Sequence, residues 1–124
     1  MNGDVNTETG VSLNKQLAQA LGWRVEKMRS GYYALVLPNS VSYPSYLSER
    51  EAWQHAPDFK YSVDASLAAL PENFHVHIEP YHDGYLTGII NPAAETSTLW
   101  QGEGATRAEA LARATLAWAQ RQEG

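Results

Sequence analysis

The chain has 124 residues, no cysteine, and nine Lys and Arg against 14 Asp and Glu, which gives a formal net charge of −5 at pH 7. This length predicts one small domain, and 44% hydrophobic residues are enough to form a core. The acidic balance excludes the broad positive field of non-specific nucleic-acid binding, and the lack of cysteine excludes disulfides, thiolate zinc sites and cysteine catalysis. Since we find no apolar run of about 18 residues and no signal peptide, we expect a cytoplasmic protein.

The first third of the chain is predicted to hold a tail, a helix and a hairpin. Residues 1–11 are mostly polar, so we expect a flexible tail before a single domain over residues 12–122. Ser12 is suited to cap a helix over residues 13–21, which Gly22 would end. The β-prone residues on either side of Gly31 predict a hairpin of 23–28 with 32–37. The Ser, Pro and Tyr residues of 39–46 predict a loop.

Two short helices are predicted in the middle of the chain. Ser48 and Glu51 have the spacing of a capping box, in which the serine hydroxyl accepts from the Glu51 amide and the glutamate bonds the amide of the cap residue. This predicts a helix from Glu49 to about His55. Ser62 is predicted to cap a second helix, which ends near Pro71.

The last third is predicted to be a hairpin, a further strand and a long helix. Apolar and polar residues alternate over 74–79, Asp83-Gly84 is a hairpin signal, and 85–91 supply the second strand. Residues 96–101 are β-prone, and glycines over 102–104 predict a break. A second capping box at Thr106 begins a helix that reaches about residue 122.

This order of elements predicts an α+β fold. We expect one antiparallel sheet, built from two hairpins plus an additional strand. An N-terminal helix, short middle helices and a long C-terminal helix would cover it as an α/β/α layered sandwich.

Several segments together resemble the phage ABA sandwich domain, a family of uncharacterised proteins encoded mainly by phages and prophages. The segment LNKQLAQALGW over residues 13–23, YSVD over 61–64, the hairpin containing Tyr85 and the helix TRAEALARATLAWAQ over 106–120 carry the resemblance. Three residues separate Pro57 from Tyr61 where the family has one, which affects the geometry expected near residues 38–60. The resemblance implies a phage-encoded protein in the host-cell cytoplasm.

A more local similarity covers residues 74–120. The segments FHVHIEP over 74–80, DGY over 83–85 and GATRAEAL over 104–111 resemble the strand, turn and helix of HicB-type antitoxins. Such proteins pair with a small RNA-cleaving toxin. A hairpin followed by a strand and a capped alanine-rich helix is also a common arrangement, so convergence is the preferred explanation of this local similarity.

Two polar patterns contain residue types that are suited to a chemical site. His75, His77 and Glu79 share one side of a strand and are metal-ligand types, but residues i and i+4 of a strand lie about 13 Å apart. A polar face that is either solvated or covered by a helix is therefore the preferred interpretation, and we expect no metal, no cofactor and no catalytic residue. Gly102-Glu103-Gly104 before a helix is the nearest approach to an anion-binding turn, although the capping box would use the same amides.

Aromatic residues interleaved with cations are the main candidate for ligand binding. Aromatic rings and guanidinium planes stack on nucleobases, and cations pair with phosphate. We expect tyrosines and a tryptophan to stack on the ligand and arginines to bind phosphate. The predicted ligand-binding residues are Tyr43, Tyr46, Trp53, Tyr61, Arg29, Arg50 and Arg107.

Three functions are compatible with these features. The first is a non-catalytic, homo-oligomeric protein that sequesters a small nucleotide-derived signal to counter bacterial defence; in size and charge the chain resembles the Thoeris anti-defence proteins. The second is a protein-binding inhibitor or antitoxin-like module whose acidic surface masks a basic nucleic-acid-binding partner. The third is an enzyme, which would depend on His75, His77, Glu79 and a bound metal. We expect no direct nucleic-acid or membrane binding.

Overall fold

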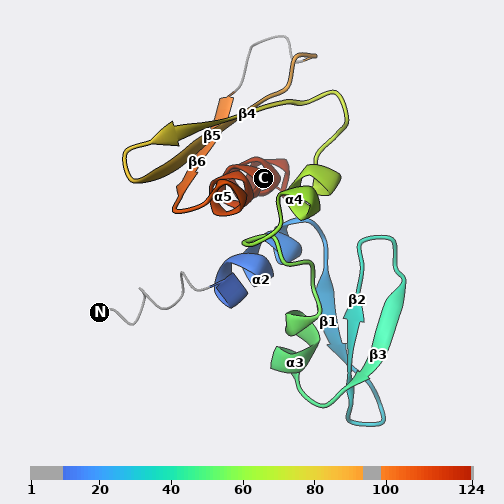
Figure 1. The fold of residues 1–124 in the computed structure, drawn as a ribbon. Coiled ribbons are helices and arrows are strands. Elements are labelled where there is room, and N and C mark those ends of the chain that lie inside the picture. The colour runs from blue at the N-terminus through green and yellow to red at the C-terminus, as the bar shows by residue number, and fades with distance from the viewer. Residues whose placement is uncertain (1–9, 94–98, 124) are drawn as a thin grey trace. The chain divides into compact units, whose positions relative to one another are not determined.

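The computed structural model describes residues 10–93 and 99–123 and divides the chain into two compact units, Met1–Pro57 and Asp58–Gly124 (Figure 1). Each unit has the same order of elements, which is a helix, three antiparallel strands and a helix. The predicted α+β class is confirmed. The six strands form two sheets of three rather than one sheet, because each strand pairs with its neighbour in sequence and residues 47–74, with two helices, separate the third strand from the fourth. That residues 12–122 act as one domain stays a prediction.

Helix α2 begins the described part of the first unit. It spans Gly10–Ala20, so Ser12 lies inside the helix and is not its N-cap. The last two residues of the predicted tail are helical, and residues 1–9 lie outside the described part of the chain. As predicted, Gly22 follows the helix, with φ +102°, and the Trp23 amide donates to the Ala18 carbonyl at 2.9 Å. This is a Schellman motif, which needs a residue in the left-handed region.

The sheet of the first unit contains a strand that the sequence did not predict. Strands β1 (Arg24–Lys27) and β2 (Tyr33–Val36) form the predicted hairpin, with Gly31 at φ +93°. The prediction of a loop over residues 39–46 is wrong for Ser42–Tyr46, which form strand β3 and pair with β2. Pro44 has no amide hydrogen to donate. Because β3 is an edge strand, the sheet tolerates a residue that cannot donate at this position. The pairing of β3 with β2 is irregular: the register shifts between Tyr33 and Leu35, and Ser45 has a positive φ.

Helix α3 (Glu49–Gln54) begins at a capping box with one difference from the predicted pattern. The Ser48 hydroxyl accepts from the Glu51 amide at 3.1 Å. The Glu51 carboxylate accepts from the Leu47 amide at 2.6 Å, one residue before the cap, and not from the cap residue's own amide. Ala52 and Trp53 are buried, and the helix packs against β1 and β2.

The second unit consists of α4 (Val63–Ala69), β4 (His75–Tyr81), β5 (Gly84–Ile90), β6 (Leu99–Gly104) and α5 (Arg107–Glu123). The strand order is β4-β5-β6, and α5 lies on one face of the sheet (Figure 1). The predicted cap at Ser62 is confirmed, since its side chain accepts from the Ala65 amide. The turn between β4 and β5 is His82-Asp83, one residue earlier than the sequence indicated, with His82 at φ +54°.

Glycine allows α5 to approach β6 closely. A Cβ on Gly102 would lie 2.3 Å from the Ala114 nitrogen and 2.6 Å from the Ala110 carbonyl oxygen, both of the helix backbone. The predicted break over residues 102–104 is therefore wrong, because these glycines continue β6 and admit the helix. Residues 96–98 of the predicted strand lie outside the described residues.

The two faces of this sheet differ. Val76 and Ile78 of β4 and Ile89 of β5 pack with Leu111 and Ala114 of α5 in the core of the unit. The residues that alternate with Val76 and Ile78 are exposed, as the sequence pattern predicts. Residues Gln101 and Glu103 of β6 are exposed in the same way, while Gly102 between them lies against α5. The sheet thus has a core face and a face turned away from α5.

Candidate functional site

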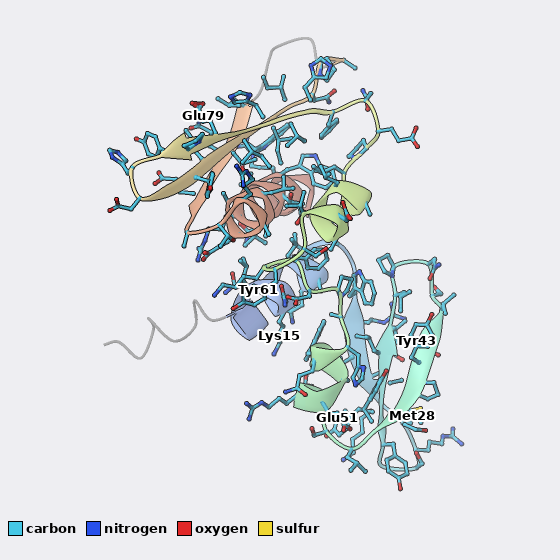
Figure 2. All side chains as sticks on the ribbon, viewed as in Figure 1. Lys15, Met28, Tyr43, Glu51, Tyr61 and Glu79 are labelled. Carbon is cyan, nitrogen blue, oxygen red and sulfur yellow. The ribbon has the colours of Figure 1, made fainter. Side chains whose placement is uncertain are left out.

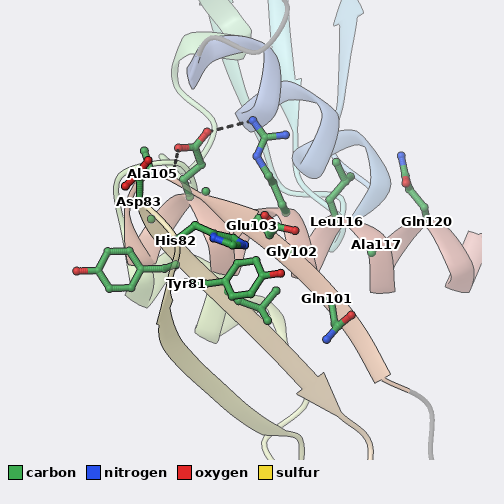
Figure 3. A pocket seen from close by; sticks show the side chains of 16 residues that line it. Tyr81, His82, Asp83, Gln101, Gly102, Glu103, Ala105, Leu116, Ala117 and Gln120 are labelled. Atoms are coloured by element: carbon green, nitrogen blue, oxygen red, sulfur yellow. Dashed lines mark hydrogen bonds and ion pairs between the residues drawn. The ribbon is translucent and has the colours of Figure 1, made fainter.

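A broad groove of about 830 Å³ in the second unit is the candidate site (Figure 3). Its walls come from the turn between β4 and β5, from β6 and from one flank of α5. The α5 residues of this flank recur at helical spacing, so their side chains lie in one row along the helix. The residues that line the groove are Tyr81, His82, Asp83, Gly84, Tyr85, Leu86, Gln101, Gly102, Glu103, Gly104, Ala105, Glu109, Arg113, Leu116, Ala117 and Gln120.

Carboxylates dominate the charge of the groove. Asp83, Glu103 and Glu109 line it, and Arg113 is the one Lys or Arg among its lining residues. The Arg113 guanidinium lies 3.0 Å from the Glu109 carboxylate, in a pair one helical turn apart. Its positive charge is therefore largely offset by Glu109, which leaves the charges of Asp83 and Glu103 in excess.

Glu109 belongs to both the groove and the start of α5. The Thr106 hydroxyl accepts from the Glu109 amide at 3.1 Å, and the Glu109 carboxylate accepts from the Ala105 amide at 3.0 Å. As in α3, the carboxylate bonds the residue before the cap, which differs from the predicted capping box. Partial burial raises the pKa of the Glu109 carboxyl, but the hydrogen bonds from Arg113 and Ala105 outweigh it and hold the pKa below its ordinary value. Glu109 is ionised at pH 7.

The charge of the chain is also unevenly distributed along the sequence. Residues 1–57 contain five acidic residues (Asp and Glu) and five basic residues (Lys and Arg). Residues 58–124 contain nine acidic and four basic residues. The whole formal charge of −5 therefore belongs to the second unit, which also contains the groove. Composition alone could have revealed this asymmetry.

Five of the seven predicted ligand-binding residues belong to the first unit. Tyr43 of β3 is 52% exposed, and Figure 2 shows its position on that strand. Arg29 and Arg50 are also exposed, in the β1–β2 turn and in α3. The Tyr46 ring stacks on His55 with 4.6 Å between centroids. Trp53 is only 6% exposed, and the Lys15 ammonium lies 5.6 Å from its ring centroid, so a core position accounts for this residue.

The other two predicted residues belong to the second unit. Tyr61 is 67% exposed, with the Lys60 ammonium 5.6 Å from its ring centroid. Arg107 is on the first turn of α5, and its guanidinium lies 4.7 Å from the ring centroid of Tyr85 in β5. The capping hydrogen bonds and the Glu109 carboxylate occupy the turn that the sequence suggested for an anion. The ligand-binding roles of all seven residues stay predictions.

The predicted polar row of β4 lies on the face turned away from α5, where Figure 2 labels Glu79. His77 Nε2 lies 3.4 Å from Glu79 Oε1, and both side chains are at least half exposed. Within residues 10–93 and 99–123, no three His, Asp or Glu side chains come together as a potential metal site.

Most of the groove could not be predicted from the sequence. Its residues come from a turn, an edge strand and a helix flank, which no single motif connects. One signal in the sequence could have indicated the α5 wall. Glu109, Arg113, Leu116 and Gln120 recur at helical spacing and form a row separate from the buried residues Leu111 and Ala114.

No family model, curated protein or solved structure matches the chain. In the part of the chain that the structure describes, no helix has the length and apolar character needed to cross a membrane.

Proposed function

We propose that this chain is a non-catalytic binding protein that holds a basic segment of a partner protein in the groove of its second unit. The observation that carries the proposal is the set of three carboxylates in the groove against one guanidinium that is already paired. A partner that binds nucleic acid through a positive surface has the complementary charge, so masking such a surface is the corresponding inhibitory role.

The electrostatic contribution is expected to affect both the rate and the salt dependence of binding. Carboxylates that line a groove attract a cationic partner over about 10 Å at 0.1 M salt, and added salt screens this attraction. The apolar residues Leu116 and Ala117 provide contact area in the same groove that salt does not weaken. Affinity for a basic peptide should therefore fall with salt without vanishing.

A matched pair of variants tests the proposal. Glu103 and Glu72 are both exposed glutamates of the second unit, but only Glu103 lines the groove. Titration of the whole protein with a lysine hexapeptide should show several-fold weaker binding for Glu103→Gln and unchanged binding for Glu72→Gln. Equal effects of the two substitutions would show that net charge alone attracts the peptide, and the groove would then not be the site.

Sequestration of a nucleotide-derived signal against bacterial defence is a second candidate, supported by the first unit. There Tyr43 is half exposed, and Arg29 and Arg50 lie in a unit whose acidic and basic residues are equal in number. A ligand at about 100 times its dissociation constant adds about 2.7 kcal/mol to the free energy of unfolding, which thermal unfolding against a nucleotide panel would detect. A shift that Tyr43→Ala abolishes would favour this candidate; no shift across the panel would remove it.

A further inference from the structure

Strand β6 is an edge of the second sheet. In the order β4-β5-β6 it pairs with β5 along one side, and among the described residues no strand pairs with its other side. An edge strand presents alternate backbone N–H and C=O groups that can bind another strand. Proteins often block such edges with charged side chains, proline or a covering helix. Here Glu103 is the one charged residue of β6, and the strand contains no proline.

The groove lies beside this edge. Gln101 and Glu103 are exposed on the face turned away from α5, while Leu116, Ala117 and Gln120 belong to α5 on the opposite face. All five line the same groove (Figure 3), so its space includes both sides of the strand that separates them. Residues 101–104 of β6 line the groove and span about 13 Å at 3.3 Å per residue. The α5 row from Glu109 to Gln120 spans about 16 Å at 1.5 Å per residue, so the α5 wall is the longer of the two.

We propose that an extended, basic segment of a partner protein adds to β6 as a fourth strand of this sheet. The inference rests on the proposed function and specifies how the groove holds its partner: main-chain hydrogen bonds to β6 supply binding, and side-chain contacts supply selectivity. Charge complementarity argues for a basic partner over a second copy of this chain. A second copy would bring its own Asp83 and Glu103 to a groove that already has these charges in excess.

The two faces of the sheet set the side-chain pattern of the added strand. Alternate residues of a strand point to opposite faces. One set would lie beside Gln101 and Glu103, where lysine or arginine fits the carboxylate. The other set would lie beside Leu116 and Ala117 of α5, where an apolar side chain fits. The segment selected is therefore one that alternates basic and apolar residues.

Two isomeric peptides separate strand addition from simple charge attraction. Both are hexapeptides that alternate lysine and valine; one is N-methylated on the lysines and the other on the valines. In an added strand only one of these two sets of amides faces β6. We expect one isomer to bind the whole protein at least about tenfold more weakly than the other, because up to three hydrogen bonds are lost. Equal affinities would overturn the inference, even if both peptides still bind in a salt-dependent manner and the proposed function stands.

A blocking substitution and hydrogen exchange locate the bound strand. Ala117→Trp should fill the α5 side of the groove and weaken the unmethylated peptide about tenfold, whereas Ala68→Trp, on the exposed side of α4, should not. Amide exchange over Leu99–Gly104 should slow when the peptide binds. The inference would be contradicted if Ala117→Trp bound the peptide with wild-type affinity. It would also be contradicted if protection of these amides rose with protein concentration in the absence of peptide, because that result would indicate pairing of two copies. Failure of every lysine peptide to bind would instead reject the proposed function itself.

Discussion

Replacing Gly102 with alanine tests the close packing of α5 on β6. The added Cβ would lie 2.3 Å from the Ala114 nitrogen, 2.6 Å from the Ala110 oxygen and 2.8 Å from the Arg113 carbonyl carbon. All three are backbone atoms, so no side-chain rotation relieves the contact. Because non-bonded heavy atoms prefer about 3.5 Å, the helix must move by roughly 1 Å. Overpacking commonly costs about 1–3 kcal/mol, and we expect Gly102→Ala to be near the upper end, about 3 kcal/mol.

Urea unfolding followed by tryptophan fluorescence measures this loss, since Trp100 and Trp118 pack against the core of the second unit. Gly88→Ala is the matched control: it lies in the adjacent strand, and its Cβ would meet only the end of the Leu99 side chain, at 3.2 Å. We expect the control to change the free energy of unfolding by less than about 1 kcal/mol. Wild-type stability in Gly102→Ala, or equal losses in both variants, would refute the argument from helix approach.

Three further predictions concern the second unit. Thr87 and Thr115 are both fully buried, but the Thr87 hydroxyl has no hydrogen-bond partner among the described residues, whereas the Thr115 hydroxyl donates to the Leu111 carbonyl at 2.8 Å. Thermal unfolding should therefore show Thr87→Val stabilised by about 1 kcal/mol and Thr115→Val unchanged or destabilised. Because the pKa of Glu109 is lowered in the folded state, its stabilising contribution is complete above the ordinary value of 4.5 and is lost as pH falls through the folded value. In urea titrations, Glu109→Gln should accordingly lower stability at pH 7, and its difference from wild type should shrink as the pH falls below 4.5. Thr106→Ala removes the cap of α5 and should cost about 1 kcal/mol in the same assay; no loss would show that the Glu109 carboxylate suffices to cap the helix.

Local signals in the sequence predicted most elements of the fold. The caps at Ser48, Ser62 and Thr106 and the glycine after α2 specify helix ends through hydrogen bonds made within a few residues. Strand β3 was missed because its Ser, Pro and Tyr residues have no strand pattern, and its pairing with β2 determines its conformation. The division into two sheets depends on pairing between strands, which the pattern of single strands does not contain.

The candidate site was less predictable than the fold. The sequence drew attention to aromatic residues, yet Trp53 is buried and the seven predicted residues are divided between two units. The groove depends on where α5 lies along β6, and that position depends on Gly102, which the sequence indicated as a chain break. A glycine that admits a helix and a glycine that ends a strand look alike until the packing is known.

The meander order of both sheets has a consequence for how the chain folds. Every strand pair joins neighbours in sequence, through turns as short as His82-Asp83 between β4 and β5. Forming each sheet therefore closes only short loops and loses little chain entropy before its contacts form. Proteins whose contacts are local in sequence fold faster than those with long-range strand pairing. Each sheet thus forms from strand pairs within its own unit and needs no strand from the other unit.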